Sequence, residues 1–313
     1  MKILKPGFLT SIQDAGRCGV AHMGVARGGA GDAISMRLGN LLVGNDESTA
    51  AIEMTLVGGT FESEEDAVIA ITGGDFELRL DGTAIPLWTS QQISAGQTLS
   101  VGPARSGVRC YLCIRGGVDV PLVLGSASMH FPGRFGGLDG RVLVRGQVVP
   151  LRHVQNAETG STPWRVRPDL LSRLRQRAPF RVTEGPQHGG FEPEAFATLT
   201  SSAYEVLEDS NRVGLRLRGP QLRAVSTADM LTEGAPIGAI QVPPDGQPII
   251  LFVDQPTTGG YPKIANVISA DIHRVGQLRP RDQVHFERVS FARALELLQE
   301  LEALIGRHAL EPA

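Results

Sequence analysis

An internal echo in the sequence predicts that the chain folds as two related units. Residues 12–20 resemble residues 207–215, where an Asp, an Arg and a Gly recur at the same spacing. Two further matches follow in the same order: residues 58–61 and 67–71 match 238–241 and 249–253, and residues 97–101 match 282–286. Because the order is kept along the chain, we expect two β-rich domains, at residues 1–165 and 166–313.

Glycine and proline are abundant, which favours short strands joined by turns. The 313 residues include 38 Gly and 20 Pro, and 42% of them are hydrophobic, as in a globular β-rich protein. Apolar periodicity predicts helices at residues 33–43, 168–175 and 291–305. A polar stretch at residues 155–167 is expected to connect the domains. The expected fold is mainly β with a few α-helices.

Charge and hydropathy argue against several classes of partner. A formal net charge of −3 gives no electrostatic reason to bind nucleic acid or an anionic membrane surface. No apolar stretch approaches the roughly 20 residues that span a bilayer. The N-terminus has no apolar segment of signal-peptide length. These features predict a cytoplasmic protein that binds neither nucleic acid nor membrane.

Metal and nucleotide motifs are missing from the sequence. Cys110 and Cys113 form a C-x-x-C in a predicted strand, where residues three apart point to opposite faces. The seven histidines are scattered and form no H-E-x-x-H, so no metal site is expected. No phosphate loop, dinucleotide fingerprint or nucleophile elbow occurs either. The sequence therefore predicts no self-sufficient enzyme of these familiar types.

A glycine-rich polar segment at residues 13–32 is the first candidate binding site. Glycines such as Gly28 and Gly29 let backbone N–H groups approach a ligand closely. Asp32 is placed to cap the helix that follows, and a helix N-terminus attracts negative charge. Its carboxylate is also a candidate substrate-binding acceptor. His22 adds a titratable imidazole.

Asp14 and Arg17 of this segment recur in the echo as Asp209 and Arg212. A repeated element is more often architectural than catalytic, so a structural pair that pins the first turn is the preferred interpretation. Arg17 is also kept as a candidate substrate-binding cation.

The loop before Lys263 is the second candidate site. The chain has only three lysines, Lys2, Lys5 and Lys263, and Arg fills the other basic positions. An ammonium is a compact point charge, whereas a guanidinium is a wide planar fork. The loop also supplies hydroxyls, flexible backbone and one aromatic ring: Thr257, Thr258, Gly259, Gly260 and Tyr261. Such groups suit a carboxylate, a phosphate or a developing oxyanion; the alternative is a β-turn with a solvated Lys.

Glu53 is a candidate general base. Alternation in residues 51–56 places Glu53 and Thr55 on the face opposite Ile52 and Met54. If that face lines a cleft, Glu53 could act as a base with a raised pKa. If it faces water, Glu53 is ordinary polar surface.

Several of these segments resemble the family of 5-oxoprolinase C subunits, also described as the biotin-dependent carboxyltransferase, allophanate hydrolase subunit 2 or KipA family. The resemblance is carried by Q-D-x-G-R-x-G-x-x-H-x-G-V-x-x-G-G-A-x-D at residues 13–32, and by residues 238–248, 257–265 and 267–271. It implies two cyclophilin-like β-barrel domains, in agreement with the echo.

The resemblance also implies an activity. Family members act with two further proteins, the A subunit and a KipI-like B subunit, to open the lactam of 5-oxo-L-proline to L-glutamate with ATP hydrolysis. The ATP would be bound by this chain or by the partner subunits. Lys263 would stabilise developing charge, while Glu53 or His22 would handle protons.

Two alternatives stay open. Related domains in urea carboxylase move a carboxyl group from carboxybiotin to urea. None of the three lysines has the Met-Lys-Met context of biotin attachment, so any biotin would arrive on another chain. The KipA name instead implies a non-catalytic regulator that binds a kinase inhibitor.

Overall fold

The computed structural model describes residues 1–152, 163–176, 178–225 and 230–313, which form two compact units. Unit 1 comprises Met1–Cys18, Gly28–Arg175 and Leu304–Ala313, and unit 2 comprises Gly19–Arg27 and Gln176–Ala303. The predicted domains, divided at residues 165 and 166, are each continuous in sequence, whereas both units here are discontinuous. Most of the predicted connector at residues 155–167 lies outside the described residues.

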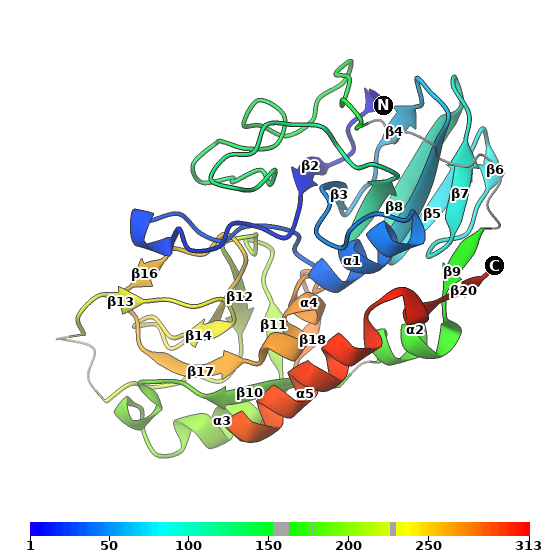
Figure 1. The fold of residues 1–313 in the computed structure, drawn as a ribbon. Helices are drawn as coiled ribbons and strands as arrows, with labels where there is room; N and C mark the ends of the chain where they lie inside the picture. Colours follow the sequence, from blue (N-terminus) through cyan, green and yellow to red (C-terminus); the bar gives the residue numbers. More distant parts are fainter. Residues whose placement is uncertain (153–162, 177, 226–229) are drawn as a thin grey trace. The chain divides into compact units, whose positions relative to one another are not determined.

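Unit 1 is built on an eight-stranded sheet (Figure 1). The sheet path is β1 (Lys2–Lys5), β4 (Thr60–Glu62), β8 (Thr98–Ile114), β3 (Ala51–Thr55) and β2 (Leu9–Gln13), and β5 (Ala67–Leu80) pairs with β6 (Thr83–Ala84), β7 (Ser90–Ile93) and β8. Irregularities in the β5–β8 register between Gly73 and Leu78 bend this long pair. The sheet is a half-barrel. A small sheet of β9 (Trp164–Val166) and β20 (Leu310–Pro312), helix α2 (Pro168–Leu174) and η4 (Arg307–Ala309) complete the unit.

Helix α1 (Ala33–Leu42) packs against β5 and β8 of unit 1. It begins where the Asp32 carboxylate accepts a hydrogen bond from the backbone N–H of Ser35 at 3.0 Å. Its apolar side chains Ile34, Leu38 and Leu42 are buried. A Cβ on Gly39 would lie 2.6 Å from the Cys113 sulfur, so glycine allows the helix to approach the sheet closely.

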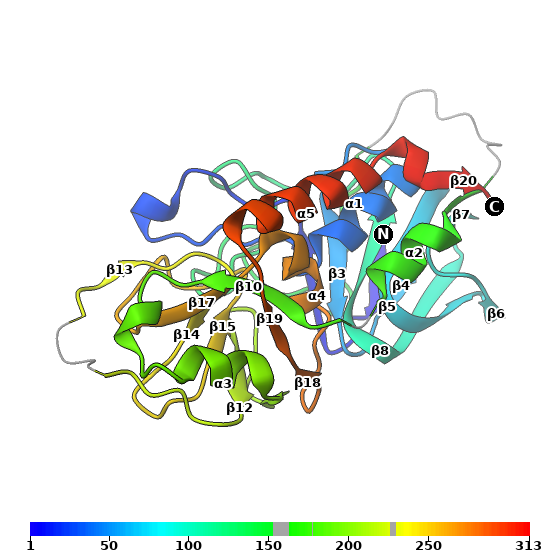
Figure 2. The ribbon, with the colours of Figure 1, turned by 90° about the horizontal axis from the view of Figure 1, so that it is seen from below.

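Unit 2 is built on a second eight-stranded sheet. Its path is β18 (Gln283–Val284), β11 (Tyr204–Val206), β12 (Gly214–Arg218), β15 (Ile249–Leu251), β14 (Ala239–Gln241), β17 (Lys263–Val267), β10 (Phe180–Glu184) and β19 (Phe286–Arg288). The two ends of this path, β18 and β19, are separated in sequence only by His285. Figure 2 shows β19 beside β10, with which it pairs in parallel. The chain thus joins the sheet's own ends, and the sheet is a nearly closed barrel.

Short elements surround this barrel. Strands β13 (Glu233–Gly234) and β16 (Thr258–Gly259) form a separate two-stranded sheet. The helical elements that begin in unit 2 are α3 (Ala195–Ser201), α4 (Ile272–Val275), α5 (Phe291–Leu304), η1 (Ala21–Met23), η2 (His188–Gly190) and η3 (Ser269–Asp271). No helix among the described residues combines the length and apolarity needed to cross a membrane.

The predicted mainly-β fold is confirmed, and so are the three predicted helices. The short helices α3 and α4 were not predicted, because seven and four residues carry too little periodicity to be recognised. Two apolar residues of α5 do not face a core, because Phe291 is 79% exposed and Leu295 is 50% exposed.

The echoed aspartates occupy unequal positions in the two units, whereas the echoed arginines Arg17 and Arg212 are both buried. Asp14 is buried and its carboxylate accepts hydrogen bonds from Gly16, Ser126, Ala127 and Ser128. It thereby ties the turn after β2 to the loop at residues 126–128. Its counterpart Asp209 is exposed and makes an ion pair with Arg216 at 3.0 Å.

This difference predicts unequal costs for the same substitution. Asp14→Ala should lower the free energy of unfolding by about 3 to 5 kcal/mol, because it leaves several buried donors without their acceptor. Asp209→Ala should cost about 1 kcal/mol or less, as for an exposed ion pair. Denaturant unfolding of both variants tests this. Similar small losses for the two variants would contradict the structural role of Asp14.

Candidate functional site

Glu53 lies at the centre of a buried polar cluster in unit 1. Its side chain is 1% exposed, so the alternative that it faces water is wrong. Its cross-strand partner Tyr111, on β8, donates its hydroxyl to Glu53 Oε2 at 2.8 Å. The backbone N–H of Gly31 donates to the same oxygen at 2.8 Å, and Arg109 Nε lies 3.6 Å from Oε1. These contacts hold the carboxylate in one position.

Backbone amides at the start of α1 donate hydrogen bonds to side chains of this cluster. Besides the Gly31 amide bound to Glu53, the Asp32 amide donates to the Tyr111 hydroxyl oxygen at 2.7 Å. The sequence predicted that amides here would face a ligand; these two instead serve a carboxylate and a phenol of the same unit. The Asp32 carboxylate, predicted to bind substrate, accepts from Ser35 N and Ser35 Oγ.

Tyr111 stays protonated in this environment. Burial, and then the Glu53 charge, raise the pKa of its phenol well above the usual value. The hydroxyl therefore remains a donor to Glu53 at physiological pH.

Arg17 is buried and holds a loop. Its Nε donates to the Val123 carbonyl at 3.1 Å and its Nη2 donates to the Ser128 carbonyl. Its guanidinium lies over the Phe135 ring, 4.8 Å from the centroid. These contacts favour the architectural interpretation of Arg17, and its predicted role in substrate binding stays a prediction.

The glycines of the first segment allow close backbone packing. Gly28 and Gly29 are buried and have positive φ angles of 62° and 88°. A Cβ on Gly29 would lie 2.9 Å from Gly16 N and 3.0 Å from Asp14 O, so glycine is required there for steric reasons. His22 is exposed in η1, in unit 2, whereas Glu53 belongs to unit 1.

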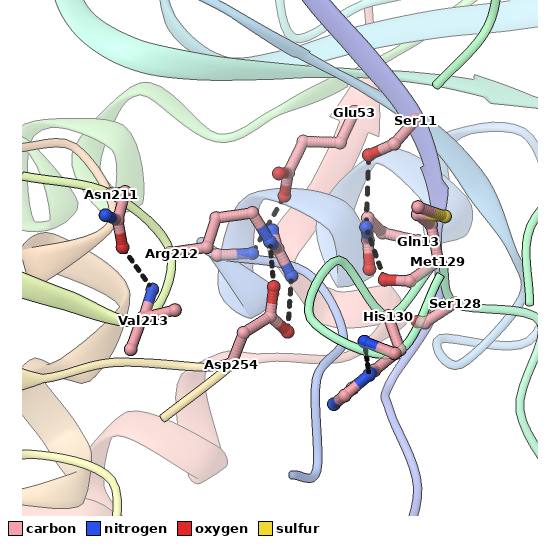
Figure 3. A network of polar contacts seen from close by, with 12 residues as sticks. Ser11, Gln13, Glu53, Ser128, Met129, His130, Asn211, Arg212, Val213 and Asp254 are labelled. Carbon is pink, nitrogen blue, oxygen red and sulfur yellow. Dashed lines mark hydrogen bonds and ion pairs between the residues drawn. The ribbon is translucent and has the colours of Figure 1, made fainter. Parts of the chain in front are cut away.

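Two buried polar groups were not predicted as candidates. His130 is 5% exposed, its Nδ1 accepts from Gly133 N at 3.0 Å, and its ring stacks on Phe135. In unit 2, Arg212 Nε donates to Asp254 Oδ2 at 2.8 Å, and both side chains are buried (Figure 3). No motif marks His130, whereas Arg212 belongs to the echo at residues 207–215, which favoured an architectural role.

Lys263 is the centre of a second polar cluster, in unit 2. It is the first residue of β17 and its side chain is 1% exposed, so the alternative of a solvated lysine in a turn is wrong. Its ammonium makes an ion pair with Glu233 Oε1 at 2.6 Å. Gln187 Nε2 donates to the same Glu233 oxygen at 2.6 Å, while Gln187 Oε1 accepts from the Lys263 backbone N–H at 3.1 Å.

Backbone pairing explains how these residues meet. The β14–β17 register is irregular: Ile240 pairs with Ala265, but Gln241 pairs with Lys263, so Ile264 is the extra residue of a bulge. Bulges re-aim side chains and are frequent beside active sites. Glu233 in turn pairs with Gly259 on β16. A Cβ on Gly259 would lie only 2.6 Å from Gln241 Nε2.

The remaining predicted loop residues lie at or near the surface. Thr258, Gly260 and Tyr261 are exposed, and Thr257 is half-buried with its carbonyl accepting from Ala235 N at 3.0 Å. The loop thus combines exposed hydroxyls and a ring with the buried ammonium that follows it.

Neither a thiol site nor a metal site emerges from the described residues. Cys110 and Cys113 are buried, unbridged residues of β8, and burial raises the pKa of both thiols. No group of three His, Cys, Asp or Glu side chains there is arranged to hold a metal ion.

Comparison with known proteins identifies the family. The family model described as "Carboxyltransferase domain, subdomain A and B" matches residues 23–288. The chain belongs to this carboxyltransferase-domain family. Among its relatives, the chain is 37% identical to the C subunit of the 5-oxoprolinase of Escherichia coli (strain K12), over 96% of this chain and 94% of that protein. It is also 37% identical to the urea amidolyase of Saccharomyces cerevisiae (strain ATCC 204508 / S288c), over 97% of this chain but 17% of that protein.

Solved structures support the same assignment. The urea carboxylase of Kluyveromyces lactis superposes with a TM-score of 0.90 at 31% identity, covering 100% of this chain and 29% of that chain. The carboxyltransferase-domain chain therefore spans nearly the whole of the 5-oxoprolinase relative, but less than a third of the urea enzymes.

The Lys263 cluster predicts the titration of Glu233. The hydrogen bond from Lys263, and then that from Gln187, hold the pKa of the Glu233 carboxyl below its ordinary value. The stabilisation is therefore present above the ordinary glutamate pKa and is lost as the pH falls through the lowered one. Carboxyl-carbon NMR should show this lowered pKa, and Lys263→Met should raise it towards the ordinary value. A pKa unchanged in Lys263→Met would contradict the ion pair.

Proposed function

We propose that the chain is the C subunit of an ATP-dependent 5-oxoprolinase that opens 5-oxo-L-proline to L-glutamate. The observation that carries this proposal is a match over nearly the full length of both proteins. The Escherichia coli and Haemophilus influenzae proteins of that name match at 37% and 35% identity, and 94% of each is covered. On this proposal the chain acts with an A subunit and a KipI-like B subunit, in the cytoplasm.

The Lys263 cluster offers chemistry suited to lactam opening. Attack on an amide carbonyl moves negative charge onto its oxygen, and donors fixed in a water-poor site stabilise that charge. Lys263 is a fixed donor of this kind, buried and held by Glu233. Proton transfer by Glu53 or His22 stays a prediction.

We assign the ATP to the partner subunits. This chain lacks the G-x-x-x-x-G-K-[ST] phosphate loop. The Gly31 and Asp32 amides at the start of α1, a place where a phosphate could dock, donate instead to Glu53 and Tyr111. These residues do not fit a phosphate group, so no step in this chain is assigned to ATP.

A second function is favoured by a specific observation. The family model is named for a carboxyltransferase domain, and the urea amidolyase and urea carboxylase relatives cover nearly all of this chain. A carboxyltransferase half would take its carboxyl group from biotin on another chain. In that reaction the Lys263 ammonium would bind the carbonyl oxygen of urea.

Reconstitution separates these functions. The chain mixed with its cognate A and B partners should release glutamate and phosphate from 5-oxo-L-proline and ATP, and should be inactive by itself. Failure of the reconstituted set to make glutamate would refute the proposal. Carboxylated urea formed with a biotin carboxylase and carrier would establish the alternative.

Lys263→Arg tests the role of the ammonium in that reconstituted set. A guanidinium keeps the charge but not the compact shape, so kcat should fall about 100-fold or more, as for loss of one oxyanion donor. Lys2→Arg is the matched control, because Lys2 is 43% exposed and its amine lies 3.7 Å from Glu62. It should leave kcat unchanged. Full activity of Lys263→Arg, with an unchanged melting temperature, would remove Lys263 from the mechanism.

A further inference from the structure

The side-chain amide of Gln241 is buried and has an unused donor. Gln241 is 5% exposed, and its Nε2 has no hydrogen-bond partner among the described residues. A buried donor without an acceptor destabilises a fold. A hydrophobic side chain of similar volume would avoid this cost. The amide thus invites a functional explanation.

Gln241 lies opposite Lys263, whose ammonium is buried, on the neighbouring strand. As direct cross-strand partners in an antiparallel pair, Gln241 and Lys263 place their side chains on the same face of the sheet. An ammonium has three donors, and its one ion pair among the described residues is with Glu233. Two neighbouring side chains therefore offer spare N–H groups.

Glu233 supplies the complementary acceptor. Its Oε1 forms the ion pair with Lys263 and accepts a hydrogen bond from Gln187 Nε2, while its Oε2 accepts no hydrogen bond from the described residues. The Glu233 charge balances the ammonium, so a second full anion would be repelled by the carboxylate. The cluster is better matched to a neutral amide or urea group, which has both a carbonyl oxygen and an N–H, than to a carboxylate. In 5-oxo-L-proline that group is the ring amide.

We propose that Gln241 and Lys263 form a two-donor site for the carbonyl oxygen of a cyclic amide or urea, whose N–H is accepted by Glu233. In a lactam ring the C=O and N–H lie on the same side of the amide bond, as this site requires. The inference deepens the proposed function, on which it rests, by naming Gln241 as the second donor. Gly259 keeps the approach to this amide open, because a Cβ there would lie 2.6 Å from Nε2.

The first test uses the stability of the isolated full chain. Gln241→Leu should raise the melting temperature by about 2 to 4 °C, because it removes an unsatisfied buried donor. Gln13→Leu is the matched control: Gln13 is also buried, but its Nε2 donates to Ser11 Oγ at 3.0 Å and to the Met129 carbonyl at 3.3 Å (Figure 3). This control should lower the melting temperature. A Gln241→Leu variant destabilised as much as Gln13→Leu would overturn the proposal.

The second test measures binding of 2-pyrrolidinone by NMR. Titration should shift the side-chain amide signals of Gln241 in the wild type, and Gln241→Leu should bind about tenfold more weakly. N-methyl-2-pyrrolidinone, which lacks the N–H, should also bind more weakly. Equal binding of 2-pyrrolidinone by wild type and Gln241→Leu, or acetate binding as strongly as the lactam, would contradict the proposal.

These tests are independent of turnover. They need neither partner subunits nor ATP. If the isolated chain binds the lactam as described but the reconstituted set makes no glutamate, the site stands and only the proposed function fails.

Discussion

Burial of the Lys263 ammonium is the constraint from which the candidate site in unit 2 follows. A charged group removed from water must be paired, or it is strongly destabilising. Glu233 provides the pairing charge from the short β13–β16 sheet, and Gln187 fixes the same carboxylate oxygen. The bulge at Ile264 sets Lys263 opposite Gln241. The ion pair, the two-stranded sheet and the bulge therefore act together to fix one ammonium.

Two other buried carboxylates among the described residues, Asp271 and Glu53, differ from this cluster. Asp271 accepts from the backbone N–H and the guanidinium of Arg181, and Arg274 lies 3.5 Å from it. In unit 1, Glu53 binds the Tyr111 hydroxyl and the Gly31 amide. These groups surround a carboxylate with donors, which stabilises the fold. At Lys263 and Gln241, donors are in excess, which is the arrangement expected where a ligand supplies the acceptor.

The sequence indicated part of this picture for physical reasons. Helix α1 was predictable because its cap and its apolar spacing are local. Lys263 was conspicuous because lysine is rare in this chain. Its burial was not predictable, since it depends on Gln187 and Glu233, which are 76 and 30 residues away in sequence by their numbering. Gln241 was missed because a bulge, which no residue pattern marks, decides its partner.

The position of a bound lactam is the most direct measurement of the central claim. A crystal structure of this chain with 2-pyrrolidinone or 5-oxo-L-proline should place the ring carbonyl oxygen about 3 Å from both Lys263 Nζ and Gln241 Nε2. A ring bound elsewhere, with neither nitrogen in contact with it, would contradict the account.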